Sequence, residues 1–301
     1  MRRLTAWFNA NPLRPAIASI ALILLIGATA FANQPARQER TWYPYLARTS
    51  HVELAGDRFA VTPVTDWSYT ASGPTRETYV SAAHAISDVR AVWFVIEPDP
   101  KLSFAAHTFM LFEFSGDRLL GLTIEARREA DEDYSAVAGA FNQFELSYLW
   151  GTARDLLTRR AVMLEHRVEI FPVDIPRDQM QTMLRNVLER TQALEYRPRY
   201  YNTLFSNCTN ELAKAAGFHW APAFILTGES DEYLFNRHLL SARSLAVARR
   251  RAEMEAFITQ LNAAPEAAFD ARLLAELHRR EGLLAGGEEG GQAEHDGERG
   301  H

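Results

Sequence analysis

A long apolar run near the N-terminus constrains this chain more than any other feature. Residues 16–32, "AIASIALILLIGATAFA", carry no charge, and three arginines precede them. Positive charges stay on the cytoplasmic side of a membrane, so the chain that follows is expected on the far side. The run is at the short limit for a spanning helix, and Ala30, Phe31 and Ala32 have the small-x-small form of a signal-peptidase site. Residues 1–33 are therefore either a membrane anchor or a signal peptide.

The rest of the chain divides by composition into a tether, a domain, a helical segment and a tail. Residues 34–41 are polar and contain proline, as a tether does. Residues 42–242 are expected to form the main folded domain. Residues 243–284 have the pattern of one or two amphipathic helices, interrupted near Pro265. Residues 285–301 are rich in glycine and charge and are predicted to be disordered, because they cannot bury enough apolar surface to fold.

Strand patterns come before helix patterns in the main domain, and we expect the α+β class with an antiparallel sheet packed on helices. Strands are expected at residues 89–96, 107–114, 118–127, 141–150 and 166–175. The runs 107–114 and 118–127 are joined by "SGD" and are expected to form a β-hairpin. Helices are expected at residues 177–194 and 211–216. The segment around His84, "SAAHAISDV", is interpreted as a helix or turn at the surface.

The overall charge excludes one class of partner. The chain has a formal net charge of −6 and a pI near 5.9, so it has no basic field to hold a phosphate backbone. Nucleic acid is therefore not an expected partner. Hydrophobic residues make up 47% of the chain, which is ample for one large or two modest domains.

Cys208 is the single cysteine of the chain and follows Asn207 at the start of a helix-like segment. In an oxidising compartment one thiol cannot pair within its own chain, so Cys208 is a buried inert residue, a site of attachment or a reactive group. If Asn207 is the helix N-cap, the sulfur lies in the first turn, where free N–H groups and the helix dipole favour a thiolate. This position suits a nucleophile, and the alternative is a small core cysteine on a helix that only packs, since buried free cysteines are common.

A nucleophile needs a base, and His107 is the candidate because it opens a strand at the end of the predicted sheet. With a three-residue turn the hairpin pairs Phe114 with Arg118, and His107 then stands opposite Glu125. Opposite residues share a face with Cβ atoms about 5 Å apart, so Glu125 is predicted to orient the imidazole as the third member of a triad. A two-residue turn would place Glu125 on the other face, and a surface ion pair is the alternative role for this carboxylate.

Several separated motifs resemble one bacterial family. "AHTFMLFEF", "LTIEARREADEDYSAVAGAFNQFELSYLWGTARDLL" and "YNTLFSNCTNEL" together resemble the Lnb N-terminal periplasmic domain family, and "WAPAFILTGESDEYLF" fits its C-terminal part. The similarity runs from about residue 76 to about residue 240. It implies a permuted papain-like thiol fold, akin to lecithin:retinol acyltransferase, with the histidine strand before the cysteine helix. The family's histidine falls on His107 and its cysteine on Cys208.

The resemblance also implies a reaction. The family's namesake is understood to move a fatty acyl chain onto the N-terminal amine of bacterial lipoproteins, and thiol chemistry at Cys208 agrees with such a transfer from a phospholipid. The oxyanion is expected near the backbone N–H of Cys208 and the side chain of Asn207 or Asn202. Arg127 and Arg154 are expected to serve structure or the binding of a lipid headgroup, because a guanidinium does not deprotonate.

No metal or cofactor is predicted, because the chain has no HExxH motif, no second cysteine and no close pair of histidines. The expected location is the periplasmic face of the bacterial inner membrane, or the periplasm if the signal is cleaved. Two other functions stay open. One is a periplasmic thiol amidase or peptidase on cell-wall peptides, and the other is an envelope binding domain without catalysis. An apolar channel beside Cys208 would favour the transferase, and an open polar groove the peptidase.

Overall fold

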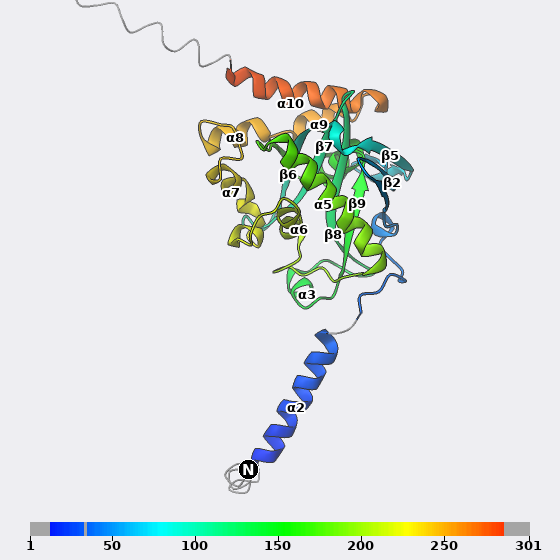
Figure 1. The fold of residues 1–301 in the computed structure, drawn as a ribbon, viewed down its shortest axis with the longest axis vertical. Helices are drawn as coiled ribbons and strands as arrows, with labels where there is room; N and C mark the ends of the chain where they lie inside the picture. The colour runs from blue at the N-terminus through cyan, green and yellow to red at the C-terminus, as the bar shows by residue number, and fades with distance from the viewer. Residues whose placement is uncertain (1–12, 33–34, 286–301) are drawn as a thin grey trace, which may run out of the picture. The chain divides into compact units, whose positions relative to one another are not determined.

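The structure is a computed structural model that describes residues 13–32 and 35–285 (Figure 1). It forms two compact units, Met1–Glu39 and Arg40–His301. In the described part of the first unit, helix α2 (Leu13–Ala32) covers the apolar run. Within the described ranges, no helix has both the length and the hydropathy that crossing a membrane requires. The predicted disorder of the tail beyond Ala285 concerns residues outside the described part of the chain.

The second unit, called the main unit below, is built on a mixed eight-stranded sheet. Its strands are β1 (His51–Ala55), β2 (Arg58–Thr65), β5 (Tyr79–Ala85), β6 (Val89–Pro98), β7 (Ala106–Phe114), β8 (Arg118–Arg127), β9 (Glu145–Gly151) and β10 (Glu169–Pro172). The order is β1-β2-β9-β8-β7-β6-β10, with β5 paired to β2. A small separate sheet pairs β3 (Ser68–Thr70) with β4 (Gly73–Arg76).

The predicted α+β class is therefore confirmed, but the sheet is not wholly antiparallel. β2 and β9 pair in parallel through Thr65 and Gly151, and the other pairs are antiparallel. This parallel contact joins β1, β2 and β5 to β9, which lies beside the hairpin of β7 and β8. Strands β1, β2 and β5 were not predicted from the sequence. A pattern of apolar residues within one strand does not say which distant strand lies beside it, so this pairing was out of reach of sequence reasoning.

Helices cover both faces of the sheet because side chains alternate between two hydrophobic cores along its strands. Phe94 and Phe112 belong to the core under α5 (Arg177–Tyr196) and α6 (Cys208–Ala215). Val95 and Leu111 belong to the core under α4 (Ala153–Thr158), α9 (Glu255–Leu261) and α10 (Phe269–Ala285). Figure 1 shows α5 lying across the strands, with α6 beside it.

The last two C-terminal helices complete the second core, whereas the first places Ala248 and Ala252 in the core under α5 and α6. The predicted one or two helices of residues 243–284 are three in the structure: α8 (Leu245–Ala252), α9 and α10. The predicted interruption near Pro265 is present, since Pro265 caps a short turn before α10. Met254, Phe269 and Leu273 are buried in the same core as the sheet residues. The remaining helical elements are α3 (Ala136–Ala140), α7 (Ser230–Asn236) and the short turns η1 (Pro44–Leu46), η2 (Ile86–Asp88), η3 (Arg159–Met163), η4 (Pro222–Phe224), η5 (Thr227–Glu229) and η6 (Glu266–Ala268).

The interpretation of the segment around His84 as a surface helix or turn is wrong. His84 lies in β5, is only 9% exposed and stacks on Phe114 with ring centroids 4.1 Å apart. Its alanine neighbours suit a helix by composition, but pairing with β2 decides the conformation.

Candidate active site

The hairpin of β7 and β8 has the register that the three-residue turn predicts. Phe114 pairs with Arg118 and Phe109 with Thr123, so the two-residue alternative does not apply. Gly116 and Asp117 in the turn have positive φ angles of 81° and 54°, which the tight reversal requires.

The same register brings His107 and Glu125 together. Nε2 of His107 lies 3.3 Å from Oε1 of Glu125. Thr123 stands between them: Nε2 of His107 is 2.7 Å from its hydroxyl, which in turn donates to Oε1 of Glu125 at 2.7 Å. The hydroxyl therefore accepts a hydrogen bond from Nε2–H, which fixes the tautomer whose Nδ1 can accept from another partner. Thr123 was missed by sequence reasoning, although it lies two residues before Glu125 and so shares its strand face.

Helix α6 brings Cys208 close enough to His107 for each side chain to shift the pKa of the other. Asn207 is the N-cap, as predicted, and its side chain accepts from the N–H of Asn210 at 2.8 Å. Cys208 is the first residue of the helix and is 4% exposed. The hydroxyls of Thr108 and Thr209 lie 2.8 Å apart, which ties the start of α6 to β7.

The sulfur and the ring influence each other's protonation. Burial alone would raise the pKa of Cys208, but hydrogen bonding with His107, the charge of that ring and hydrogen bonds from Thr108 lower it to about 7. Burial alone would lower the pKa of His107, but the charge of Glu125 and hydrogen bonds with Cys208 and Glu125 raise it to about 10. The pair therefore favours thiolate and imidazolium between these two values.

A buried ionic network continues from Glu125 away from the sulfur. Nη2 of Arg160 lies 3.4 Å from Oε1 of Glu125, and its Nε lies 2.8 Å from Glu97. Glu97 in turn contacts Nδ1 of His166 at 2.6 Å. Burial would raise the pKa of Glu125, but the charges of His107 and Arg160 and hydrogen bonds from His107 and Thr123 hold it well below its usual range. The carboxylate therefore stays charged beside the ring.

Cys208 and His107 open into a cavity of about 510 Å³. Its walls are largely apolar and come from strands β7 and β8 and from loops beside them, with Phe104, Ala106, Ile124, Ala126, Ile225 and Leu226 among the lining residues. Tyr134 and Tyr201 also line it, with hydroxyl oxygens 3.5 Å apart. These two tyrosines were not among the predicted site residues.

The side-chain amides of Asn207 and Asn202, which were predicted to bind an oxyanion, are engaged in other hydrogen bonds. Nδ2 of Asn207 donates to the carbonyls of Thr203 and Phe224, at 2.8 and 2.6 Å. Nδ2 of Asn202 donates to Ala140 O at 3.1 Å and to Oδ1 of Asn142 at 2.8 Å. Each amide has two hydrogens, so both groups are used in holding loops and neither is left for an oxyanion.

The two predicted headgroup arginines are also structural. Arg127 is buried and donates to the carbonyls of Leu46 and Ala47 at 2.9 and 2.7 Å. Arg154 donates to Ser68 and Glu266, both at 2.9 Å. Arg127 lies on the same strand face as Glu125 but does not reach the cavity, because residues 42–47 cover that end of β8.

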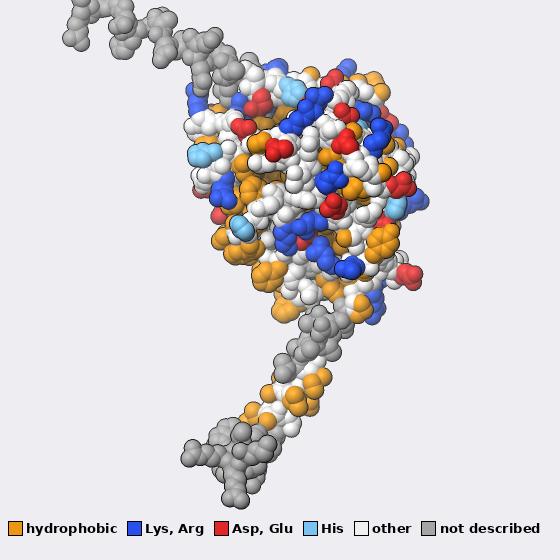
Figure 2. All heavy atoms as spheres, in the orientation of Figure 1, with side chains coloured by type: hydrophobic (Ala, Val, Ile, Leu, Met, Phe, Trp, Pro, Cys, Tyr) orange, Lys and Arg blue, Asp and Glu red, His pale blue; other side chains and the backbone are white. Residues whose placement is uncertain are grey.

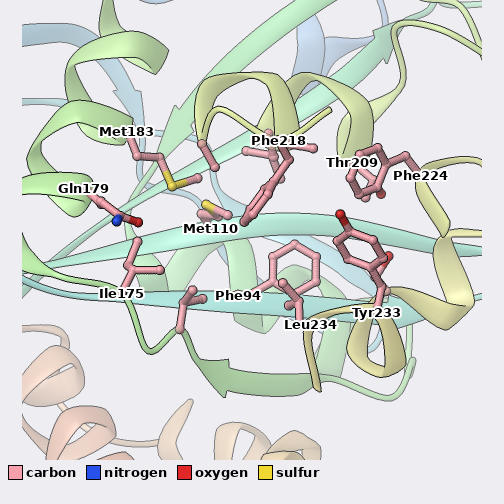
Figure 3. A pocket seen from close by; sticks show the side chains of 15 residues that line it. Phe94, Met110, Ile175, Gln179, Met183, Thr209, Phe218, Phe224, Tyr233 and Leu234 are labelled. Atoms are coloured by element: carbon pink, nitrogen blue, oxygen red, sulfur yellow. The ribbon is translucent and has the colours of Figure 1, made fainter. Parts of the chain in front are cut away.

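A second cavity lies behind α6, against Thr209 and Leu212 (Figure 3). Figure 3 shows it enclosed by apolar side chains such as Met110, Met183 and Phe218. Its volume is about 50 Å³, which is room for only a few water-sized groups. An acyl chain therefore has space in the larger cavity and not in this one.

Glu211 anchors α6 three residues after Cys208. Its carboxylate is fully buried and receives hydrogen bonds from Tyr148 at 2.7 Å, Ser206 at 2.6 Å and Lys214 at 2.8 Å, while Arg199 lies 3.0 Å away. Burial alone would raise the pKa of Glu211, but these hydrogen bonds and the charge of Arg199 lower it to about 2.

Replacing Glu211 is therefore expected to destabilise the main unit. Glu211→Ala leaves the buried Tyr148 hydroxyl without its acceptor. The free energy of unfolding, measured with urea, should fall by about 3–5 kcal/mol. Because the folded pKa is depressed, the contribution is complete above the unfolded pKa and disappears as pH falls toward 2. Glu189→Ala, at an exposed site on α5, is the control and should change little. Equal stability of the two variants would contradict the anchoring role.

Comparison with known proteins agrees with the motifs that surround this site. The model of the Lnb N-terminal periplasmic domain matches residues 75–241, which is more than half of the chain and includes both His107 and Cys208. No curated protein and no solved structure matches. A periplasmic location agrees with the far side of the membrane that the N-terminal run predicts. The chain belongs to the Lnb N-terminal periplasmic domain family.

Proposed function

We propose that this protein is a periplasmic, membrane-associated cysteine acyltransferase. The observation that carries the proposal is the thiol of Cys208 at the start of α6, which lines a large, mainly apolar cavity together with His107 and has a pKa that this ring lowers. The donor is a phospholipid, and the acceptor is an amine such as a lipoprotein N-terminus. The order of His107 before Cys208 supports the permuted papain-like arrangement that the family resemblance implies.

The first half of the reaction forms a thioester. The thiolate of Cys208 attacks the carbonyl carbon of the lipid ester, forming a C–S bond and an oxyanion. When this intermediate collapses, the ester C–O bond breaks and the imidazolium of His107 gives its proton to the departing alcohol oxygen. The lysolipid leaves, and the acyl chain stays on sulfur. Glu125 supports the positive charge that the ring carries before this step.

The second half releases the acyl chain to the acceptor. The amine nitrogen attacks the thioester carbon while neutral His107 takes a proton from that nitrogen. The C–S bond then breaks, which restores the thiolate and imidazolium. The oxyanion of both halves is assigned to the backbone N–H of Cys208, because the first N–H groups of a helix have no intrahelical acceptor.

The transferase is tested with the purified full-length chain in mixed vesicles. Phosphatidylethanolamine is the donor, and a synthetic peptide with a diacylglyceryl-cysteine N-terminus is the acceptor. Mass spectrometry should find the N-acylated peptide and lysolipid in equal amounts. Free fatty acid without N-acylated peptide, or cleavage of an added cell-wall peptide, would assign the site to a hydrolase. No product in any arm would favour a binding domain.

Thr123 is expected to act as a positioning residue. Thr123→Val removes the hydroxyl between His107 and Glu125, and kcat/KM should fall roughly 5- to 30-fold, as for a hydrogen bond worth about 1–2 kcal/mol. The alkaline limb of the pH–rate profile should also move to lower pH, because the imidazolium is less supported. Thr158→Val, at another buried threonine, is the control. A lower rate with an unchanged pH profile would mean that Thr123 has only a packing role.

A further inference from the structure

We propose that a ring of apolar side chains around the mouth of the Cys208 cavity docks the main unit onto a lipid surface. This surface would explain how a water-insoluble donor reaches the site. Its role in catalysis rests on the proposed function. The ring is defined by nine residues whose exposed fractions run from 37% to 69%: Leu102, Phe104, Tyr134, Val137, Phe141, Leu204, Phe205, Trp220 and Leu226.

These nine side chains are unusually concentrated. Elsewhere in the described part of the main unit, the large apolar side chains with comparable exposure are Val80, Leu164 and Tyr196. Figure 2 shows hydrophobic side chains gathered over the part of the main unit where Figure 1 places α3 and α6. Single exposed apolar residues are ordinary, but a contiguous set on a soluble domain indicates an interaction site.

Hydrogen bonds join the segments of the ring to one another. The N–H of Gly228 donates to the carbonyl of Phe104 at 3.0 Å, which links the loop before β7 to the segment after Leu226. The hydroxyl of Thr203 donates to Ala136 at 2.8 Å, which links the loop of Leu204 and Phe205 to α3.

Asn207 joins these two halves of the ring. Its amide donates to the carbonyls of both Thr203 and Phe224. Asn207 itself lines the cavity beside Cys208, as do Phe104, Tyr134 and Leu226. Four members of the ring, Leu102, Phe104, Tyr134 and Leu226, therefore line the cavity itself.

The chemistry of the ring favours lipid over a protein partner. Aromatic side chains on separate loops, Trp220 and Tyr134 among them, suit the boundary between headgroups and acyl chains. The chain has two lysines, Lys101 and Lys214, and 30 arginines among its 32 basic residues.

Both lysines flank the ring. Lys101 precedes Leu102, and Nζ of Lys214 donates to the carbonyl of Phe205 at 2.7 Å. A lysine extends an apolar stem and places its charge at a headgroup, so Lys101 complements an anionic bilayer, whereas the charge of Lys214 is paired with Glu211. α2 is a second element of the same chain with exposed apolar side chains, Ile23 and Leu24 among them.

The ring is tested by the depth of labels in the full-length chain. Cys208→Ala removes the native thiol, and Val137→Cys or Phe205→Cys then carries a single nitroxide. Val80→Cys is the matched control, since Val80 is also an exposed apolar residue but lies on β5. The protein is reconstituted in vesicles of phosphatidylethanolamine and phosphatidylglycerol. Labels at Val137 and Phe205 should lose collisions with a water-soluble nickel chelate and gain collisions with oxygen, while the Val80 label stays accessible to nickel.

Two results would overturn the docking proposal. One is equal nickel accessibility at all three sites in vesicles. The other is observed in detergent without vesicles. If the ring labels there become less accessible to nickel as the protein concentration rises, the ring binds a second copy of this chain. Because every labelled variant lacks the thiol, the test does not depend on catalysis. A docked protein without transferase activity would reject the proposed function and keep the docking surface.

Discussion

Cys208→Ala is expected to reduce acyl transfer to background, by a factor on the order of a million if the thiol is the nucleophile. No other cysteine exists in the chain to replace it. The fold should remain, because the side chain contributes one small buried group and α6 is held by the Asn207 cap and the Glu211 network. Initial rates of N-acylation, with circular dichroism and thermal unfolding as controls for folding, measure the effect.

Cys208→Ser sharpens this prediction. A hydroxyl fills the same space but is far less ionised than a thiol at neutral pH, so this variant should also be nearly inactive. Its stability should match that of the native protein. Native turnover in either variant would remove Cys208 from the mechanism.

His107→Ala should cost nearly as much activity, and it should change the acidity of the thiol. Alkylation of the single cysteine should rise with pH through a midpoint near 7 in the native protein. Without the ring, burial should raise that midpoint to at least the ordinary thiol value of about 8.5. The imidazolium itself is lost as pH rises through about 10, so transfer should decline above that value. An unchanged alkylation midpoint in His107→Ala would show that the ring does not support the thiolate.

Glu125 should act through His107. Glu125→Gln keeps the shape of the side chain but removes its charge, and it should lower activity less than His107→Ala does. Adding Glu125→Gln to His107→Ala should cost almost nothing further, because the carboxylate then has no ring to support. Additive losses would place the function of Glu125 elsewhere, for example in holding Arg160.

Local rules were enough to predict the core of the candidate site. The length of the turn fixed the hairpin register, and the register placed His107 beside Glu125. The asparagine before Cys208 predicted the start of α6. Each of these inferences needs only neighbours in sequence or one antiparallel pair, for which geometry leaves few alternatives.

The remainder depended on contacts between distant segments. Arg160 reaches Glu125 from η3, and Glu97 reaches Arg160 from β6, so no spacing along the chain reveals the network. Asn202 and Asn207 had the right chemistry for an oxyanion but use their amides on loop carbonyls. The apolar ring was also hidden, because exposed and buried phenylalanines look alike in a sequence.

The central claim is that Cys208 carries the acyl chain, and intact-mass spectrometry after acid quenching tests it most directly. The full-length protein is mixed with a phospholipid donor in the absence of an acceptor amine. The account predicts a mass increase of one acyl group that maps to the peptide of Cys208, is released by neutral hydroxylamine and is absent from Cys208→Ala. N-acylated product that forms while Cys208 stays unmodified at every time point, or that still forms with Cys208→Ala, would contradict it.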